Sequence, residues 1–212
     1  MIELYLIRHA ESIFNVNSAY ISGRSNYAPL SKKGEFQSEL LGNRFVNENL
    51  KFAKIYSSIA VRANKTAEIS CKKAGFLDEI ILSDRIVELG QGDWEGEPRD
   101  EIYTEEILKK INSDRWNFKA PNGESQKEVE ERMLFFIENE IVPKYSPGEK
   151  KAFAVFTHGF AIKCSLRGVI DFHPNKTYAV TIGNTSITKL EYDSKGWHLF
   201  SLNDTNHLKN HF

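Results

Sequence analysis

The sequence has little of several features that would place a protein in a special class. It contains only 2 cysteines among 212 residues, and Cys71 and Cys164 form neither a CxxC pair nor a zinc-ligand spacing. We therefore expect two free buried thiols rather than a disulfide framework. No apolar run approaches the roughly 18 residues that a membrane span needs, and the apolar stretch before Arg8 is too short for a signal peptide. We expect a soluble, cytoplasmic protein without membrane contact.

An excess of charge of one sign is also lacking. The chain has 28 Lys+Arg against 29 Asp+Glu, which gives a formal net charge of −1. A nucleic-acid-binding protein usually carries a basic excess, so we expect no nucleic-acid partner. The shares of hydrophobic (41%) and charged (27%) residues are ordinary for a globular protein and argue against disorder. At roughly 150 residues per domain, residues 1–212 are predicted to form one domain with an embedded insertion.

Short apolar segments alternate with amphipathic ones along most of the chain. Strands are expected over Ile2–Ile7, Lys54–Ser57, Glu79–Leu82, Phe153–Phe156, Thr185–Tyr192 and His198–Leu202. Helices are expected after Ser31, from a cap at Ser57 or Ser58 to Ala74 before Gly75, after the capping box Ser125–Glu128, and over Ala161–Val169. This alternation predicts an α/β fold, a three-layer sandwich with a mostly parallel central sheet flanked by helices.

Residues 85–123 differ in composition from the rest of the chain. They are rich in Gly, Asp, Glu and Trp, and one helix is expected over Asp100–Ile111. We interpret this segment as the insertion, lying over one end of the sheet, and call residues 85–123 the lid. Its basic side chains could bind a second anionic group of a ligand, or they could be solvated surface charges.

Polar residues follow three of the predicted strands at the point where each strand ends. Arg8 and His9 end the first strand and Asn15 lies shortly after them, Arg62 lies in the first turn of the helix after the second, and His158 follows the strand over 153–156. Ligands of open α/β sheets collect beyond the carboxyl ends of the strands. We therefore expect these side chains to converge at one edge of the sheet.

The predicted cluster suits a phosphoryl group. Guanidinium groups match phosphate oxygens, and the helix N-terminus at Arg62 adds backbone N–H donors. A zinc site made by His9 and His158 lacks further ligands at a usual spacing, and the arginines would repel a cation. We therefore expect neither a metal nor a cofactor, and a small-molecule phosphate ester as the partner.

Six sequence blocks follow one another between Leu6 and the terminal NDTNHL. They read LIRHAES, SGRSNYAPLSKKG, IYSSIAVRANKTAE, VELGQGDWEG, PNGES and FTHG. With these blocks in this order, the sequence resembles the histidine phosphatase superfamily and its phosphoglycerate mutase-like fold. The resemblance implies that His9 is the nucleophile that becomes a phosphohistidine. It also implies phosphoryl binding by Arg8, Arg62 and His158, with Asn15 beside them, and a proton donor at Glu88.

Elementary chemistry fits these implied roles. A neutral His9 can attack phosphorus, and a hydrogen bond from its other ring nitrogen to a backbone carbonyl would fix the tautomer. The arginines and a protonated His158 would stabilise the charge of the transition state. Glu88 would protonate the leaving alkoxide and then activate water. Glu95 is an alternative acid, and Asp93 is a weaker one.

Three further positions are candidates for phosphate binding. Ser22 and Gly23 belong to the second block, and Gly159 follows His158. The two glycines either serve as turn residues or allow the backbone to approach a phosphate closely.

The sequence identifies the type of reaction less specifically than it identifies the phosphoryl site. The stretch GQGDWEGEPRD resembles the phosphatase branch, because the mutases carry a tyrosine- and arginine-containing block there. We therefore predict a metal-independent phosphatase that hydrolyses phosphate monoesters. The alternatives are a cofactor-dependent phosphoglycerate mutase and a pseudoenzyme that binds a phosphorylated ligand without turning it over.

Overall fold

The computed structural model describes residues 1–209 and 211, and within them one six-stranded sheet has the order β3-β2-β4-β1-β5-β6. The strands are β1 (Ile2–Arg8), β2 (Lys54–Ser58), β3 (Ile80–Ser83), β4 (Lys151–Thr157), β5 (Ile187–Asp193) and β6 (Gly196–Asp204). Neighbours among β3, β2, β4 and β1 pair in parallel, whereas β5 is antiparallel to β1 and to β6. The predicted mostly parallel sheet is confirmed.

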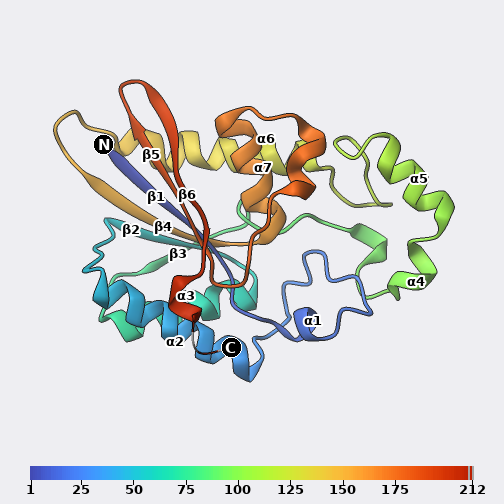
Figure 1. Cartoon of the computed structure of the whole chain (residues 1–212), viewed down its shortest axis with the longest axis horizontal. Coiled ribbons are helices and arrows are strands. Elements are labelled where there is room, and N and C mark those ends of the chain that lie inside the picture. Colours follow the sequence, from blue (N-terminus) through green and yellow to red (C-terminus); the bar gives the residue numbers. More distant parts are fainter. Residues whose placement is uncertain (210, 212) are drawn as a thin grey trace.

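Helices cover both faces of this sheet (Figure 1). Helices α2 (Lys32–Asn47) and α3 (Val61–Ala74) lie on one face, and α6 (Gln126–Phe136) and α7 (Gly159–Ile170) on the other. Successive side chains of a strand point to opposite faces. Leu4 and Leu6 of β1 accordingly pack in the core with α6 and α7, and Tyr5 and Ile7 pack in the core with α2 and α3. The predicted three-layer sandwich is confirmed.

The two cysteines occupy opposite core layers. Cys71 lies with α2 and α3, and Cys164 lies with α6 and α7. Both are free and buried, and burial raises the pKa of the Cys71 thiol to about 12. The prediction of buried free thiols is confirmed.

Several helix ends follow the predicted capping residues. The Ser31 hydroxyl accepts a hydrogen bond from the Gly34 N–H at 3.0 Å at the start of α2. Gly75 ends α3 in the left-handed conformation, with φ +76°. Ser125 and Glu128 form the predicted capping box of α6, which continues beyond Phe136 as a π-helical segment, Ile137–Ile141.

The predicted cap of α3 is wrong. Ser57 and Ser58 belong to β2, and the N-cap position is taken by Ala60, which has no side chain able to accept a hydrogen bond. The Ser58 hydroxyl instead accepts the Ala60 N–H at 3.2 Å. As the last residue of β2, Ser58 lies where its side chain can contact residues beyond the end of the sheet.

The predicted helix over Asp100–Ile111 is also wrong in its extent, because the chain forms two helices there. These are α4 (Arg99–Ile102) and α5 (Glu105–Ser113). Thr104 interrupts them, since its hydroxyl accepts from the Ile107 N–H at 3.4 Å and begins a new helix.

The lid has a small apolar core of its own at one side of the sheet (Figure 1). Trp94 and Ala120 pack there against Ile21 from the N-terminal part of the chain. Ile21 also exchanges backbone hydrogen bonds with the lid, donating to Glu97 at 3.0 Å and accepting from Gly96 at 2.8 Å. The lid is thus attached to the loop that follows α1 (Ile13–Val16).

Within residues 1–209 and 211, every helix falls short of the length and apolarity that a bilayer span requires.

Candidate active site

His9 is the first residue beyond the central strand β1, and its backbone is held on both sides. Its N–H donates to the Thr157 carbonyl at the end of β4 at 2.9 Å. Its carbonyl accepts from the Thr185 N–H at 3.3 Å and from the Asn184 side-chain amide at 3.0 Å. With only 3% of its surface exposed, His9 has a fixed place in the fold.

The hydrogen bonds of the His9 ring define its tautomer. Nδ1 lies 2.7 Å from the Ala10 carbonyl oxygen, and since a carbonyl only accepts, Nδ1 carries the proton. Nε2 accepts from Nε of Arg62 at 3.3 Å and therefore holds the free electron pair. Burial, with the charges of Arg62 and Arg8, lowers the pKa of His9 well below its usual value. The expected hydrogen bond to a backbone carbonyl is present, and the ring is neutral.

His158 follows β4 directly and is fully buried. Its Nδ1 lies 3.1 Å from Nη2 of Arg62, which can only donate, so Nδ1 accepts. Its Nε2 consequently carries the proton and donates to the Ser58 hydroxyl at 2.9 Å. Burial, followed by the charge of Arg62, lowers the pKa of His158 well below its usual value. The expectation of a protonated His158 is therefore wrong for this arrangement.

Arg62 lies between the two histidines, in the first turn of α3, as predicted. Its Nη1 donates to the carbonyls of Arg24 and Ser25 at 2.9 and 3.0 Å, and its Nη2 to that of Gly23 at 3.4 Å. Burial lowers the pKa of Arg62 to about 10, with the charge of Glu88 opposing this effect. The guanidinium therefore stays charged at neutral pH.

Arg8 has a buried donor that no other group satisfies. Its Nη1 donates to the Ile182 carbonyl at 2.7 Å. Its Nε is one of three buried side-chain polar atoms without a hydrogen-bond partner among the described residues. Such an unpartnered donor calls for an explanation, and an anion oxygen supplies one. Burial lowers the pKa of Arg8 and the charge of Glu88 raises it.

Glu88 lies at the N-terminus of α7, on the same side as Arg8. Its carboxylate accepts from the Phe160 N–H at 3.0 Å and from the Ala161 N–H at 3.2 Å. A methyl group on Gly159 would lie 3.6 Å from Nε of Arg8 and 3.7 Å from Oε2 of Glu88. The arginine donor and the carboxylate therefore face the same space beside Gly159.

Glu95, the alternative acid, has a different environment. One carboxylate oxygen accepts from the N–H groups of Arg24 and Gln91 at 2.8 and 2.9 Å, and the other from Ser25 at 3.1 Å. Glu95 thus fixes the loop that surrounds Arg62. Gly23 has φ +47°, and a Cβ there would lie 2.3 Å from Glu95 Oε1, so the approach of Glu95 explains this glycine. Asp93, the weaker candidate, is exposed and contacts the Asn122 amide at 2.9 Å.

Asn15 connects to His9 through a neighbour. Its Oδ1 accepts from the Ser12 N–H at 3.0 Å and from the Asn184 amide at 3.3 Å. Asn184 in turn donates to the His9 carbonyl. Ser22 is half-buried in the loop before Gly23, and its binding role stays a prediction.

Sequence reasoning missed several contributors to this site. Ser58 was assigned to a helix cap, although the parallel pairing of β2 with β4 brings the ends of the two strands together. Asn184 and Arg24 lie in loops, where no periodic pattern marks a position. The sequence predicts Arg24 only as one of several basic side chains that could bind a second anionic group, and its short sequence distance from the candidate Gly23 adds to that signal.

A cavity of about 420 Å³ adjoins Glu88 beneath the lid. Leu89 and Phe160, whose N–H groups contact the Glu88 carboxylate, both line it. Its other lining residues are mostly aromatic or apolar, with two arginines: Gln91, Trp94, Arg99, Tyr103, Leu108, Ile111, Asn112, Arg115, Phe118, Ala120, Glu124, Gln126 and Tyr178. In the part of the chain that the structure describes, no three His, Cys, Asp or Glu side chains gather as metal ligands would.

An oriented neutral imidazole, two guanidinium groups and a nearby carboxylate are the parts of a phosphoryl-transfer site. An α/β fold with such a set of side chains at the ends of its strands is typical of enzymes that act on phosphoryl groups. A family model described as "Histidine phosphatase superfamily (branch 1)" matches residues 4–205, and the chain belongs to this superfamily.

Individual relatives cover almost the whole chain. A "Probable phosphoglycerate mutase GpmB" of Photorhabdus laumondii is 30% identical over 215 residues, which cover 98% of this chain and 95% of that protein. The structure of Bacillus stearothermophilus YhfR matches with a TM-score of 0.84 and 29% identity, covering 99% of this chain and 100% of YhfR. The phosphoserine phosphatase of Entamoeba histolytica in complex with 3-phosphoglyceric acid matches with a TM-score of 0.82 and 28% identity, covering 98% and 100%. These likenesses confirm the predicted phosphoglycerate mutase-like fold.

Proposed function

We propose that this enzyme hydrolyses small-molecule phosphate monoesters through a phosphohistidine on His9, with Glu88 as the proton donor. The observation that carries the proposal is the orientation of His9. Its Nδ1–H is held by the Ala10 carbonyl, so the electron pair on Nε2 faces the Arg62 guanidinium. A phosphoryl group bound by Arg62 would thus lie in front of the nucleophile.

In the first step, Nε2 of His9 attacks phosphorus and the bond between phosphorus and the ester oxygen breaks. The electron pair leaves on that oxygen, which takes a proton from the Glu88 carboxyl group. The guanidinium groups of Arg8 and Arg62 stabilise the charge on the equatorial oxygens. The unpartnered Nε of Arg8 provides a donor that such an oxygen would satisfy.

In the second step, water attacks the phosphohistidine and gives its proton to the Glu88 carboxylate. The bond between phosphorus and Nε2 breaks, phosphate leaves, and His9 returns to its neutral form. The sum of the two steps is ester plus water giving alcohol plus phosphate. Glu88 ends in the protonation state in which it began, as a general acid and base must.

The alcohol half of the ester fits the cavity beneath the lid, because this cavity adjoins Glu88, the group that would protonate the alcohol oxygen. Arg115 lies there with its guanidinium 5.1 Å from the Tyr178 ring centre, so one wall offers both charge and aromatic surface. Arg99 and Arg115 of the lid line this cavity and are placed to bind a second anionic group of the substrate.

Phosphoglycerate mutase activity is the second candidate, because the curated relatives bear that name. In a mutase, the phosphoryl group on His9 would return to another hydroxyl group instead of passing to water. The solved relatives favour hydrolysis, since they include phosphoserine phosphatase of E. histolytica in complex with phosphoserine. The stretch GQGDWEGEPRD favours the phosphatase branch as well.

A screen of phosphate esters tests the proposal. It would contain p-nitrophenyl phosphate, phosphoserine and 3-phosphoglycerate, each with and without 2,3-bisphosphoglycerate. We expect hydrolysis that is independent of the bisphosphate and lost in His9→Ala, with the exposed His198→Ala as control. Turnover retained in His9→Ala would overturn the mechanism. Bisphosphate-dependent formation of 2-phosphoglycerate would identify a mutase, and vanadate binding without any turnover would identify a pseudoenzyme.

A further inference from the structure

Glu88 lies on a segment that has no regular secondary structure of its own. Beyond β3, residues 84–90 belong neither to a helix nor to a strand. The backbone of a helix or strand is fixed by its own hydrogen-bond ladder, whereas this segment must be held by groups from elsewhere. The position of the Glu88 carboxyl group therefore depends on the groups that bind the backbone of this segment as well as on the N–H groups of α7 that bind the carboxylate.

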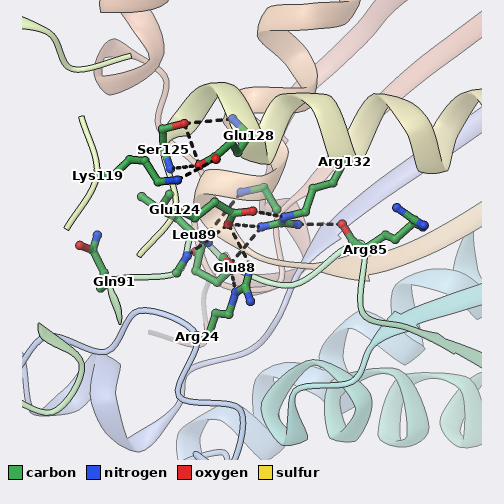
Figure 2. Close-up of polar contacts among 12 residues, drawn as sticks. Arg24, Arg85, Glu88, Leu89, Gln91, Lys119, Glu124, Ser125, Glu128 and Arg132 are labelled. Carbon is green, nitrogen blue, oxygen red and sulfur yellow. Dashed lines mark hydrogen bonds and ion pairs between the residues drawn. The ribbon is translucent and has the colours of Figure 1, made fainter. Parts of the chain in front are cut away.

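Arg132 of α6 binds this backbone at two points (Figure 2). Its Nη1 donates to the Arg85 carbonyl at 2.7 Å, and its Nη2 donates to the Glu88 carbonyl at 3.1 Å. One planar guanidinium thus spans the stretch that leads to the acid. The helix that carries this anchor, α6, is itself held in the main core through Val129 and Met133.

Glu124 orients the Arg132 guanidinium. Its two carboxylate oxygens accept from Nε and Nη2 of Arg132 at 2.7 and 3.0 Å, a bidentate pair. The two side chains are only 13% and 12% exposed. Glu124 also exchanges hydrogen bonds with Gly90, donating its N–H to the Gly90 carbonyl at 2.8 Å and accepting from the Gly90 N–H at 3.3 Å. The same carboxylate thus holds the far end of the segment.

Arg24 connects this arrangement to the phosphoryl site. Its Nε donates to the Glu88 carbonyl at 3.4 Å, and its Nη2 lies 3.2 Å from Glu124 Oε2. Its own carbonyl accepts from Nη1 of Arg62 at 2.9 Å. The Glu88 carbonyl consequently receives hydrogen bonds from two arginines, one on α6 and one on the loop around Arg62 (Figure 2).

We propose that Arg132 is a positioning residue for Glu88: with Glu124 and Arg24, it fixes the backbone of the segment so that the carboxyl group stays beside Arg8 at the N-terminus of α7. This inference rests on the proposed function, in which Glu88 protonates the leaving alcohol. Arg132 acts through the Glu88 backbone, and the residues that bind the phosphoryl group, Arg8 and Arg62, do not depend on it for a hydrogen bond.

The effect of losing this anchor depends on the leaving group. An alkyl alkoxide needs a proton from a correctly placed acid, whereas a nitrophenolate leaves readily without one. A displacement of about 1 Å in a reacting group can cost on the order of 100-fold in rate. Displacement of Glu88 should therefore slow the hydrolysis of alkyl esters selectively.

The experiment compares kcat/KM for an alkyl phosphate and for p-nitrophenyl phosphate in Arg132→Lys and Arg132→Ala. Lysine keeps the charge but cannot bind Glu124 in a bidentate manner and reach both carbonyls. The lysine variant therefore keeps the test decisive if the alanine variant does not fold. The matched control is Arg167→Lys, which weakens another ion pair of α6, between Arg167 and Glu130, away from residues 85–90.

We expect Arg132→Lys to lower kcat/KM for the alkyl ester by about 10- to 100-fold and for the aryl ester by less than about threefold. The inhibition constant of vanadate should stay unchanged, and Arg167→Lys should alter neither ester selectively. In a Glu88→Gln background, Arg132→Lys should have no further selective effect. Equal losses on both esters in Arg132→Lys, with a selective loss in Glu88→Gln, would overturn the inference and leave the proposed function standing. A Glu88→Gln variant without selective loss would instead refute the proposed role of Glu88.

Discussion

The Ser58 hydroxyl oxygen accepts a hydrogen bond from Nε2 of His158 at 2.9 Å. Arg62 can only donate, so it leaves Nδ1 of His158 to accept, and the Ser58 hydroxyl then accepts the proton that Nε2 carries. Because Arg62 also donates to His9, a serine at the end of β2 influences the geometry around the nucleophile through two intermediates.

Replacing Ser58 by alanine should therefore impair catalysis and stability together. The buried Nε2–H of His158 would lose its acceptor, at a cost of about 1–3 kcal/mol in the free energy of unfolding. We expect kcat/KM for p-nitrophenyl phosphate to fall by about tenfold as Arg62 loses its orientation. Ser57→Ala is the matched control, since Ser57 is equally buried but donates only to a backbone carbonyl. Equal activity of the two variants would contradict this role of Ser58.

Unlike Ser58→Ala, the variant Gly159→Ala should lower the activity without lowering the stability. Gly159 begins α7, where alanine is a favourable helix residue, so the Tm should stay unchanged or rise. The added methyl would lie 3.6 Å from Nε of Arg8 and 3.7 Å from Oε2 of Glu88, in the space that both groups face. We expect kcat/KM to fall by about tenfold or more. Unchanged kinetics together with an unchanged Tm would show that no phosphoryl group occupies that space.

Glu88→Gln and Glu95→Gln should have different kinetic signatures. Removing the proton donor at Glu88 should lower kcat/KM for alkyl esters by about 10²- to 10⁴-fold and for aryl esters much less. Glu95 supports the loop around Arg62 through the N–H groups of Arg24 and Ser25. Replacing Glu95 should therefore lower kcat/KM for both classes of ester to a similar extent. The reverse pattern, measured with the same two substrates, would assign the acid to Glu95.

The buried neutral histidines should make stability depend on pH. Burial lowers the pKa values of His9 and His158 well below the ordinary value near 6.5. As the pH falls below about 6.5, the histidines of the unfolded chain bind protons, whereas the same histidines in the folded chain do not. The free energy of unfolding therefore decreases. Each such histidine contributes a slope of up to about 1.4 kcal/mol per pH unit.

Urea unfolding at pH 7.5, 6.5 and 5.5 measures this slope. We expect a constant free energy of unfolding above the ordinary histidine pKa, a decrease below it, and a shallower decrease in His158→Gln. In parallel, NMR signals of ¹³C-labelled histidine should show His9 and His158 unchanged between pH 7.5 and 6. A histidine signal that titrates near 6.5 and disappears in His9→Gln would contradict the neutral nucleophile.

The predictable part of the site consists of residues that end a strand or directly follow one. Arg8, His9 and His158 could be placed together because the ends of parallel strands share one edge of the sheet. Ser58 was misassigned because a serine before a helix satisfies the capping pattern equally well whether it belongs to the helix or to the strand. The break at Thr104 was missed because the apolar pattern continues through it, although threonine followed by two glutamates is a usual helix start.

The charge state of His158 and the support of Glu88 could not be predicted for a different reason. Neutral His158 results from complete burial beside Arg62, and burial of a polar residue leaves no periodic trace in the sequence. Arg24, Glu88 and Arg132 come from three distant parts of the chain, and both arginines contact Glu88 through its backbone carbonyl. Since any residue has a carbonyl, the identity of the contacted residue carries no signal.

The central place of β1 in the sheet also bears on how the enzyme acquires its activity. The backbone of His9 is held by Thr157, the last residue of β4, and by Thr185, before β5. These partners are synthesised long after the nucleophile, and contacts of such large sequence separation form slowly. A nascent chain in which Thr157 and Thr185 have not yet left the ribosome therefore carries His9, the proposed nucleophile, without the partners that hold its backbone. The onset of activity should consequently mark the completion of folding of the whole chain rather than that of its N-terminal half.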